Sequence, residues 1–320
     1  MKKLFALAAV VAVALTSCVT TTEIPDPAGE IAFEAFNFKA QSRAHYGPIV
    51  GSAYPADEHF GAYAFFTESP NTVYMNDVEI QKDTDGAWRN TTQKYYWPNG
   101  GTLKFWCYSP YDTAHTVTHD KGFAFPDYTT TADLTKQVDL MATNVVPEAR
   151  PAAVAAVFHH MLAQVGFTAQ ANGTAKDANA EITLNKVQLS NVLPTGDYAE
   201  GAWTNLDGTP LVYEFVDTPQ VLTTTAQPVL PSGNATNALV IPQDGTEGNG
   251  DIIATIDYTI KYTDTTVDVV KGVQYKIPAP WVQGKKYIYV ITIGIGNEIT
   301  FNPTVHNWEA EGNGGTITVG

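Results

Sequence analysis

Few residues of this 320-residue sequence have the types and spacing that chemistry requires. His115 and His119 would share one face of a strand, where two imidazoles can contribute to a zinc site. No third ligand accompanies them, so a structural or solvent-exposed role is the simpler interpretation. The loop from Asp244 to Asp251 places oxygen atoms at short intervals among glycines, but it departs from the twelve-residue calcium-loop pattern. We therefore expect an acidic turn in this loop and no metal site.

The sequence also lacks the common motifs of enzymes. It contains no G-x-S-x-G, no H-E-x-x-H, no phosphate-binding loop and no dinucleotide fingerprint. A pair of carboxylates for glycoside hydrolysis cannot be selected from 33 acidic residues without geometry. The sequence therefore predicts a protein that is not an enzyme and uses no cofactor, with an enzyme of unknown type as an open alternative.

The N-terminal residues have the pattern of an export signal. Two lysines precede the uncharged apolar run Leu4 to Leu15, which is too short to span a bilayer. The small residues after this run lead directly to Cys18, a pattern similar to a bacterial lipobox, in which the cysteine becomes the N-terminus and carries acyl chains such as palmitate. We therefore expect a lipoprotein signal peptide at residues 1–17, lipidation of Cys18 and an extended tether at residues 18–29.

Composition narrows the class of partner. The chain carries 33 acidic and 18 basic side chains, a net charge of −15. A nucleic-acid partner would require a basic surface, so this charge argues against that class and favours a surface that faces the outside of a cell. With Cys18 assigned to the lipid, Cys107 has no second cysteine for a disulfide, and its apolar neighbours predict a small buried hydrophobic residue.

The apolar residues are arranged as short strands. Most stretches are rich in Val, Ile, Thr, Tyr and Phe and end at Gly, Pro, Asn or Asp. Clear examples are residues 31–36, 102–108, 182–187, 252–262 and 287–293. The alanine-rich stretch from Arg150 to Gln164 has helix-like character instead. We therefore predict an all-β chain with short helical pieces, of the kind that forms sandwiches.

A break between two halves of the chain is expected near its middle. Residues 142–153 contain prolines and polar residues between apolar runs and are the best candidate for this break. The predicted domains are an N-terminal β-sandwich at residues 30–150 and a C-terminal β-sandwich at residues 151–320.

Three stretches resemble, in their order and spacing, the motifs of one known family. They are Tyr95-Tyr96-Trp97-Pro98 followed by Leu103-Lys104-Phe105-Trp106-Cys107-Tyr108-Ser109-Pro110, then Phe158-His159-His160-Met161, and finally Trp281 to Tyr289 with the terminal Trp308. Together they resemble the Bacteroidetes fimbrillin family, the subunits of type V pili, over nearly the whole chain. The same large side chains are also expected core residues of a sandwich, so the motifs indicate fold and assembly and bring no active site.

The resemblance implies a fold and a route of assembly. Fimbrillins have two tandem transthyretin-like β-sandwich domains, are exported as lipoproteins, and lose their first strand when a trypsin-like protease cuts after an arginine. The resemblance therefore implies cleavage between Arg43 and Ala44 and removal of a strand that contains Ile31, Phe33 and Ala35. The open groove would accept a strand from a neighbouring subunit by β-augmentation, and repetition of this step yields a fibre.

The donor strand is expected in the C-terminal part of the chain. Ile299, Phe301 and Val305 alternate before Trp308, and a second short alternation, Ile317 and Val319, follows a glycine-rich hinge. A paired terminal strand of the same domain would show the same pattern. The implied partners are other pilus subunits, the outer membrane through the lipid on Cys18, and host or bacterial surface ligands. The implied location is the cell outer membrane before maturation and the fimbrium after it, and the implied function is cell adhesion.

A surface lipoprotein that binds glycans without polymerising is the alternative function. In that case some of Trp88, Trp203, Trp281 and the many tyrosines would form an exposed aromatic platform for sugar rings. The two functions are distinguished by whether these rings are exposed to solvent and coplanar.

Overall fold

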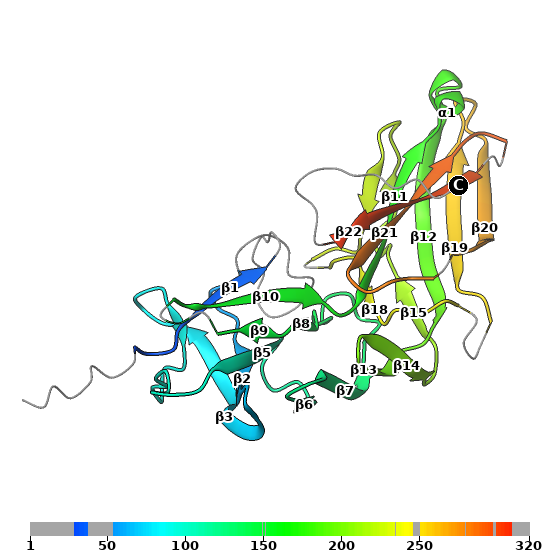
Figure 1. Cartoon of the computed structure of the whole chain (residues 1–320). Helices are drawn as coiled ribbons and strands as arrows, with labels where there is room; N and C mark the ends of the chain where they lie inside the picture. The colour runs from blue at the N-terminus through cyan, green and yellow to red at the C-terminus, as the bar shows by residue number, and fades with distance from the viewer. Residues whose placement is uncertain are drawn as a thin grey trace, which may run out of the picture.

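The computed structural model describes residues 29–37, 54–148, 150, 152–233, 235–245, 250–278, 280–296 and 299–308. The regular secondary structure of this part of the chain is almost entirely β-strand (Figure 1). The predicted all-β class is therefore confirmed. In the described ranges one helix occurs, α1 (Gly173–Asp177). None of the helical structure in these ranges is long and apolar enough to cross a membrane.

The N-terminal lobe is an eight-stranded sheet with the order β2-β3-β4-β1-β10-β8-β5-β9, in which β2 also pairs with β5. Through this additional pairing the sheet closes on itself around an apolar core that includes Phe60, Trp97 and Phe105. Its strands are β1 (Phe33–Asn37), β2 (Phe60–Phe66), β3 (Ser69–Lys82), β4 (Trp88–Arg89), β5 (Leu103–Ser109), β8 (Met141–Thr143), β9 (Val146–Pro147) and β10 (Val154–His160).

The described residues between Arg150 and Gln164 are not helical, so that prediction is wrong. Residues of β10 are buried at every second position, Val154, Ala156, Phe158 and His160, which is the period of a strand. The pairing of β10 with β1 and β8 outweighs the helix propensity of its alanines. Since β10 lies in the N-terminal sheet, this sheet continues beyond residue 150, where the sequence suggested a domain boundary.

A four-stranded sheet, β14-β13-β7-β6, connects the two halves of the chain. It contains β6 (Thr116–Thr118), β7 (Gly122–Thr129), β13 (Thr195–Ala199) and β14 (Ala202–Asp207). The core beneath it joins Tyr108 and Phe125 to Leu239, Ile241 and Trp308, residues from both halves. Because this core is shared, we expect the two halves to be rigidly connected.

The C-terminal half is a β-sandwich. One sheet has the order β17-β11-β21-β22, with β18 also paired to β11, and the other has the order β15-β12-β19-β20, with β16 also paired to β12. Their strands are β11 (Ala163–Ala171), β17 (Gln227–Val229), β18 (Ala238–Val240), β21 (Lys285–Ile293), β22 (Ile299–Asn307), β12 (Glu181–Val192), β15 (Leu211–Glu214), β16 (Gln220–Val221), β19 (Ile253–Lys261) and β20 (Val267–Lys276).

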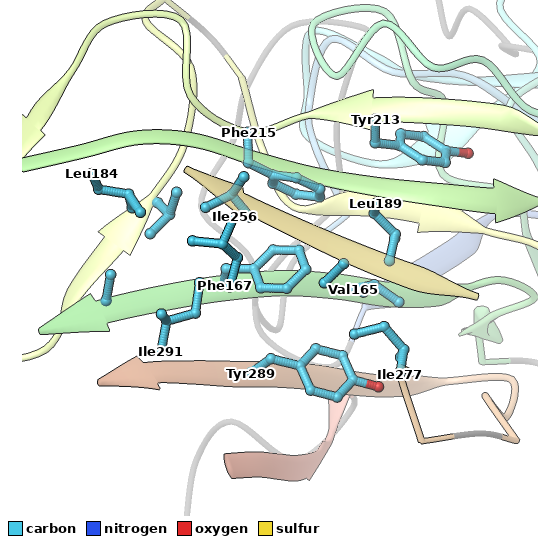
Figure 2. Close-up of a cluster of buried hydrophobic side chains, with 14 of the residues drawn as sticks. Val165, Phe167, Leu184, Leu189, Tyr213, Phe215, Ile256, Ile277, Tyr289 and Ile291 are labelled. Carbon is cyan, nitrogen blue, oxygen red and sulfur yellow. The ribbon is translucent and has the colours of Figure 1, made fainter. Parts of the chain in front are cut away.

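Alternating side chains from these two sheets meet in a common core. Figure 2 shows Phe167 and Tyr289 of the first sheet facing Leu189 and Ile256 of the second. The alternation arises because successive side chains of a strand point to opposite faces, so each strand contributes every second residue to the core. The strand predictions for residues 182–187 and 287–293 are therefore confirmed as parts of β12 and β21, and the predicted stretch 252–262 contains β19.

Candidate functional site

The first described strand, β1, occupies a slot between two other parts of the N-terminal sheet. It pairs in parallel with β10 over five residues, from Phe33 opposite Val154 to Asn37 opposite Phe158, and with β4 through Trp88 opposite Phe33. Figure 1 shows β1, in blue, beside β10. Strand β1 is thus paired on both sides although it comes from the N-terminal end of the sequence.

The residues just before β1 extend this slot. The Ile31 amide donates to the Tyr95 carbonyl at 2.8 Å, and the Trp97 amide donates to the Gly29 carbonyl at 3.1 Å. Tyr95 and Trp97 belong to one of the sequence motifs. The backbone of this motif therefore binds the residues that lead into β1, and the motif also covers the core.

Three side chains of this segment fill the core of the lobe. Ile31 and Phe33 are each 2% exposed and Ala35 is 8% exposed, so all three lie on one buried face as the alternation predicts. The Phe33 ring meets the rings of Phe60 and Phe105 edge-on, with centroids 5.7 and 5.8 Å away. Without this segment, the core of the N-terminal lobe would be open to water along the length of the slot.

An ionic contact holds the N-terminal end of the segment. The Glu30 carboxylate accepts hydrogen bonds from Arg89 Nη1 at 3.2 Å and from Lys94 Nζ at 3.3 Å. Arg89 lies on β4 and also faces Asp83 and Asp85 in the turn before that strand. The slot therefore has an apolar floor and one charged end.

The candidate donor residues Ile299, Phe301 and Val305 lie on β22. This strand forms the edge of its sheet and pairs with β21 over nine residues. All three side chains are partly buried, and the Phe301 ring stacks on Tyr289 at 5.2 Å and on Tyr275 at 5.3 Å between centroids. The lipidation residue Cys18, the cleavage residues Arg43 and Ala44, and the second donor candidates Ile317 and Val319 lie outside the described residues.

The histidines considered as metal ligands have other partners. The His115 ring lies 2.9 Å from Tyr63 Oη through Nε2, and His119 Nδ1 lies 2.5 Å from the Asp120 carboxylate. Over the described ranges, no group of three or more His, Cys, Asp or Glu side chains could hold a metal ion. Of the acidic loop, residues 246–249 lie outside these ranges.

The tryptophans named for a glycan platform in the alternative function are not exposed. Trp88 is 6% exposed and Trp281 is 2% exposed, so neither ring can belong to an exposed platform. Trp203 is half-buried, and its indole N–H donates to the Met161 carbonyl at 2.8 Å. These rings contribute to the cores instead, because their large apolar area stabilises the fold more when it is buried.

Two strongly buried titratable groups also have packing roles. Burial raises the pKa of the Cys107 thiol, and Cys107 is a free cysteine with no exposed surface, as the sequence predicts. Burial likewise raises the pKa of the Tyr54 phenol, whose oxygen lies 2.8 Å from Ser109 Oγ and donates to the His59 carbonyl at 2.9 Å. Both groups are therefore neutral at physiological pH and unsuited to nucleophilic chemistry.

A buried cluster between the two halves was not predicted from the sequence. His160 Nδ1 lies 2.9 Å from Asp139 Oδ2, and both side chains are 1% exposed. One face of this imidazole stacks on Trp308. The sequence marked His160 and Trp308 as motif residues, but only the fold shows that they touch each other.

A comparison with protein-family models gives one match to the chain. Residues 43–308 match the model described as fimbrillin-like. The chain belongs to the fimbrillin-like family. Membership of this family supports a pilus-type adhesion subunit at the cell surface, which is a structural protein that assembles with other subunits and not an enzyme.

Solved structures share the fold of this fimbrillin-like chain. A fimbrial protein from Bacteroides vulgatus matches with a TM-score of 0.64 at 16% identity, over 87% of this chain and 99% of its own. Two further matches are named putative cell adhesion proteins. They come from Bacteroides ovatus and Bacteroides uniformis and have TM-scores of 0.53 and 0.51 at 15% and 20% identity. Each match covers 88% of this chain and 98% of the other. No curated protein matches the chain.

Proposed function

We propose that the chain is a structural subunit of a type V pilus that is exported as a lipoprotein and assembled by strand exchange at the β1 slot. The observation that carries this proposal is the position of β1: a short N-terminal segment that is paired on both sides and completes the core with Ile31, Phe33 and Ala35. Such a segment can be replaced by another strand with the same alternation of apolar residues.

The energetics favour replacement over an empty slot. Burial of a large apolar side chain such as Ile31 or Phe33 contributes about 1.5–3 kcal/mol, and each backbone hydrogen bond contributes about 0.5–1.5 kcal/mol. Loss of β1 would expose the rings of Phe60 and Phe105 and leave one edge of β10 unpaired. A subunit that has lost β1 would therefore bind a strand of another subunit that fits the slot. The fibre would grow as long as such subunits are supplied.

The proposed cleavage position suits this mechanism. Arg43 lies six residues after Asn37, the last residue of β1, so a cut between Arg43 and Ala44 would separate β1 from the chain without cutting any described strand. The match to the fimbrillin-like model begins at residue 43, the proposed cleavage residue. Lipidation of Cys18 would hold the uncleaved subunit at the outer membrane until the cut releases it from its anchor.

The donor in this proposal is a C-terminal segment of a neighbouring subunit. One candidate is β22, with Ile299, Phe301 and Val305, which would first have to leave β21. The other is the segment with Ile317 and Val319. The assembled fimbrium would then serve adhesion of the cell to host or bacterial surfaces.

The test is analysis of the intact mass and N-terminus of the protein from the cell surface, before and after limited digestion with trypsin. The proposal predicts a lipid on Cys18 before cleavage, a new N-terminus at Ala44 after it, and ladders of oligomers on mild gels. A chain that keeps its lipid and stays monomeric after the cut would contradict assembly by strand exchange.

A further inference from the structure

The contact of Glu30 with Arg89, just before β1, is not explained by the apolar pattern of that strand. Glu30 stands directly before Ile31, and its side chain and that of Arg89 are 18% and 19% exposed. This pair is largely shielded from water, whereas Lys94, the second partner of Glu30, is 64% exposed. Exposed ion pairs contribute little to stability, so Arg89 supplies most of the binding of this carboxylate.

The guanidinium group of Arg89 is fixed by its own hairpin. Asp83 lies 3.6 Å from Nε and Asp85 bonds Nη2, and both aspartates lie in the turn that joins β3 to β4. Only Nη1 is directed to Glu30. Departure of β1 would therefore leave Nη1 in position but without this acceptor. A donor that is already held in place binds a new acceptor with little loss of conformational entropy.

We propose that this end of the slot selects a donor strand that carries an acidic residue directly before its first core-filling side chain. This inference rests on the proposed strand exchange. A carboxylate at that position replaces Glu30 at Arg89 Nη1, while a bulky aliphatic residue and an aromatic residue replace Ile31 and Phe33. The contact also fixes the register, because a shift by one residue would move the carboxylate away and turn the apolar side chains to solvent.

The sequence of a second copy of this chain contains a segment of the required order. Glu298-Ile299-Thr300-Phe301 repeats the order of Glu30-Ile31-Ala32-Phe33, whereas Gly315 and Thr316 precede Ile317. Its last three residues begin β22, and Glu298 itself lies outside the described residues. Among the described strands, β22 lies at the edge of its sheet, and none of its residues is fully buried. Its release therefore removes no fully buried side chain from the C-terminal core. We assign the segment from Glu298 to Val305 of a neighbouring copy as the donor.

The experiment uses the full chain cleaved after Arg43 with its N-terminal fragment still bound. Synthetic peptides of residues 29–37 and 296–305 compete for the slot, each with its native glutamate or with Glu30→Gln or Glu298→Gln, and native mass spectrometry measures release of the fragment. We expect the glutamate peptides to displace the fragment at least fivefold more effectively than the glutamine peptides, since hydrogen bonds to charged groups are the stronger ones. Higher salt should reduce this difference.

Matched variants of the chain test whether Arg89 causes the preference for glutamate peptides. Arg89→Ala should remove the preference for glutamate, whereas Lys82→Ala, a neighbouring cation over the Trp88 ring, should retain it. The peptide pairs test the proposal even if Arg89→Ala does not fold. Equal displacement by glutamate and glutamine peptides would overturn the acidic selection but leave strand exchange intact. Displacement by the 29–37 peptides but not by the 296–305 peptides would overturn the assignment of β22. Failure of all the peptides would contradict strand exchange itself.

Discussion

The imidazole of His160 stacks on the indole of Trp308 with their centroids 3.8 Å apart and their planes at 4°. His160 ends β10, the strand that pairs with β1, and Trp308 directly follows β22. This contact therefore joins the end of β10 in the N-terminal lobe to the residue that follows β22 of the C-terminal sandwich. Asp139 holds the imidazole from its edge.

This contact should be visible as a coupling energy. Trp308→Ala should lower the free energy of unfolding by about 3–5 kcal/mol because it removes a buried aromatic side chain. His160→Ala should cost a similar amount because it takes a buried partner from the Asp139 carboxylate. Urea denaturation of the single and double variants should give a double-variant cost about 1 kcal/mol below the sum. Strictly additive costs would show that the stacking contributes nothing beyond burial.

Removal of the Phe33 ring should destabilise the N-terminal lobe. Phe33→Ala deletes a side chain that is 2% exposed between Phe60 and Phe105, and we expect a loss of about 3–5 kcal/mol in the free energy of unfolding. The matched control is Glu34→Ala, an exposed position on the same strand, which should change stability by less than about 0.5 kcal/mol. Similar melting temperatures for the two variants would mean that β1 is not integral to the core.

The Cys107 thiol should be inert in the folded protein. It is fully buried, and burial raises its pKa, so neither access nor a thiolate is available to a disulfide reagent. In a Cys18→Ser chain, we expect no reaction at pH 8 in buffer and complete reaction of one thiol in denaturant. Rapid labelling in buffer would show that the core around β5 opens frequently.

Stability should fall at low pH partly through Asp133. The Thr135 hydroxyl, Lys136 and the Thr135 amide, in this order, lower the pKa of the Asp133 carboxyl from 3.8 to about 2. The contribution of this group is therefore fully present above pH 3.8 and is lost as the pH falls through about 2. Melting temperatures of wild type and Asp133→Asn should differ above about pH 4 and converge towards pH 2. In Thr135→Ala the loss should begin at higher pH, and a constant difference between wild type and Asp133→Asn would contradict this assignment.

Maturation should depend on the charge at position 43. A trypsin-like protease requires a basic side chain before the cut bond, so Arg43→Ala should keep the lipidated, uncleaved chain at the cell surface and prevent formation of fimbriae. Arg43→Lys is the matched control and should restore both cleavage and fimbriae. Immunoblots of cell-surface fractions and electron microscopy measure the two effects. Fimbriae in the Arg43→Ala strain would exclude this residue as the required site.

The sequence by itself determined the local features of this protein. The alternation of apolar residues in stretches such as 182–187 and 252–262 depends only on the two faces of a strand, and β12 and β19 form there. The motif aromatics Trp97, Phe105 and Tyr108 are buried, since large apolar side chains enter a core wherever the strands carry them. The order and spacing of these motifs also sufficed for the family.

Only the tertiary structure decided the relationships between distant segments. The parallel pairing of β1 with β10 joins residues 33–37 to residues 154–158, and no local pattern encodes a partner so far along the chain. The same pairing made β10 a strand although its alanines favour a helix. The contacts of Glu30 with Arg89 and of His160 with Trp308 have the same origin. Sequence periodicity fixes which face of a strand is apolar, but the order of strands in a sheet depends on packing of the whole chain, which brings such residues together.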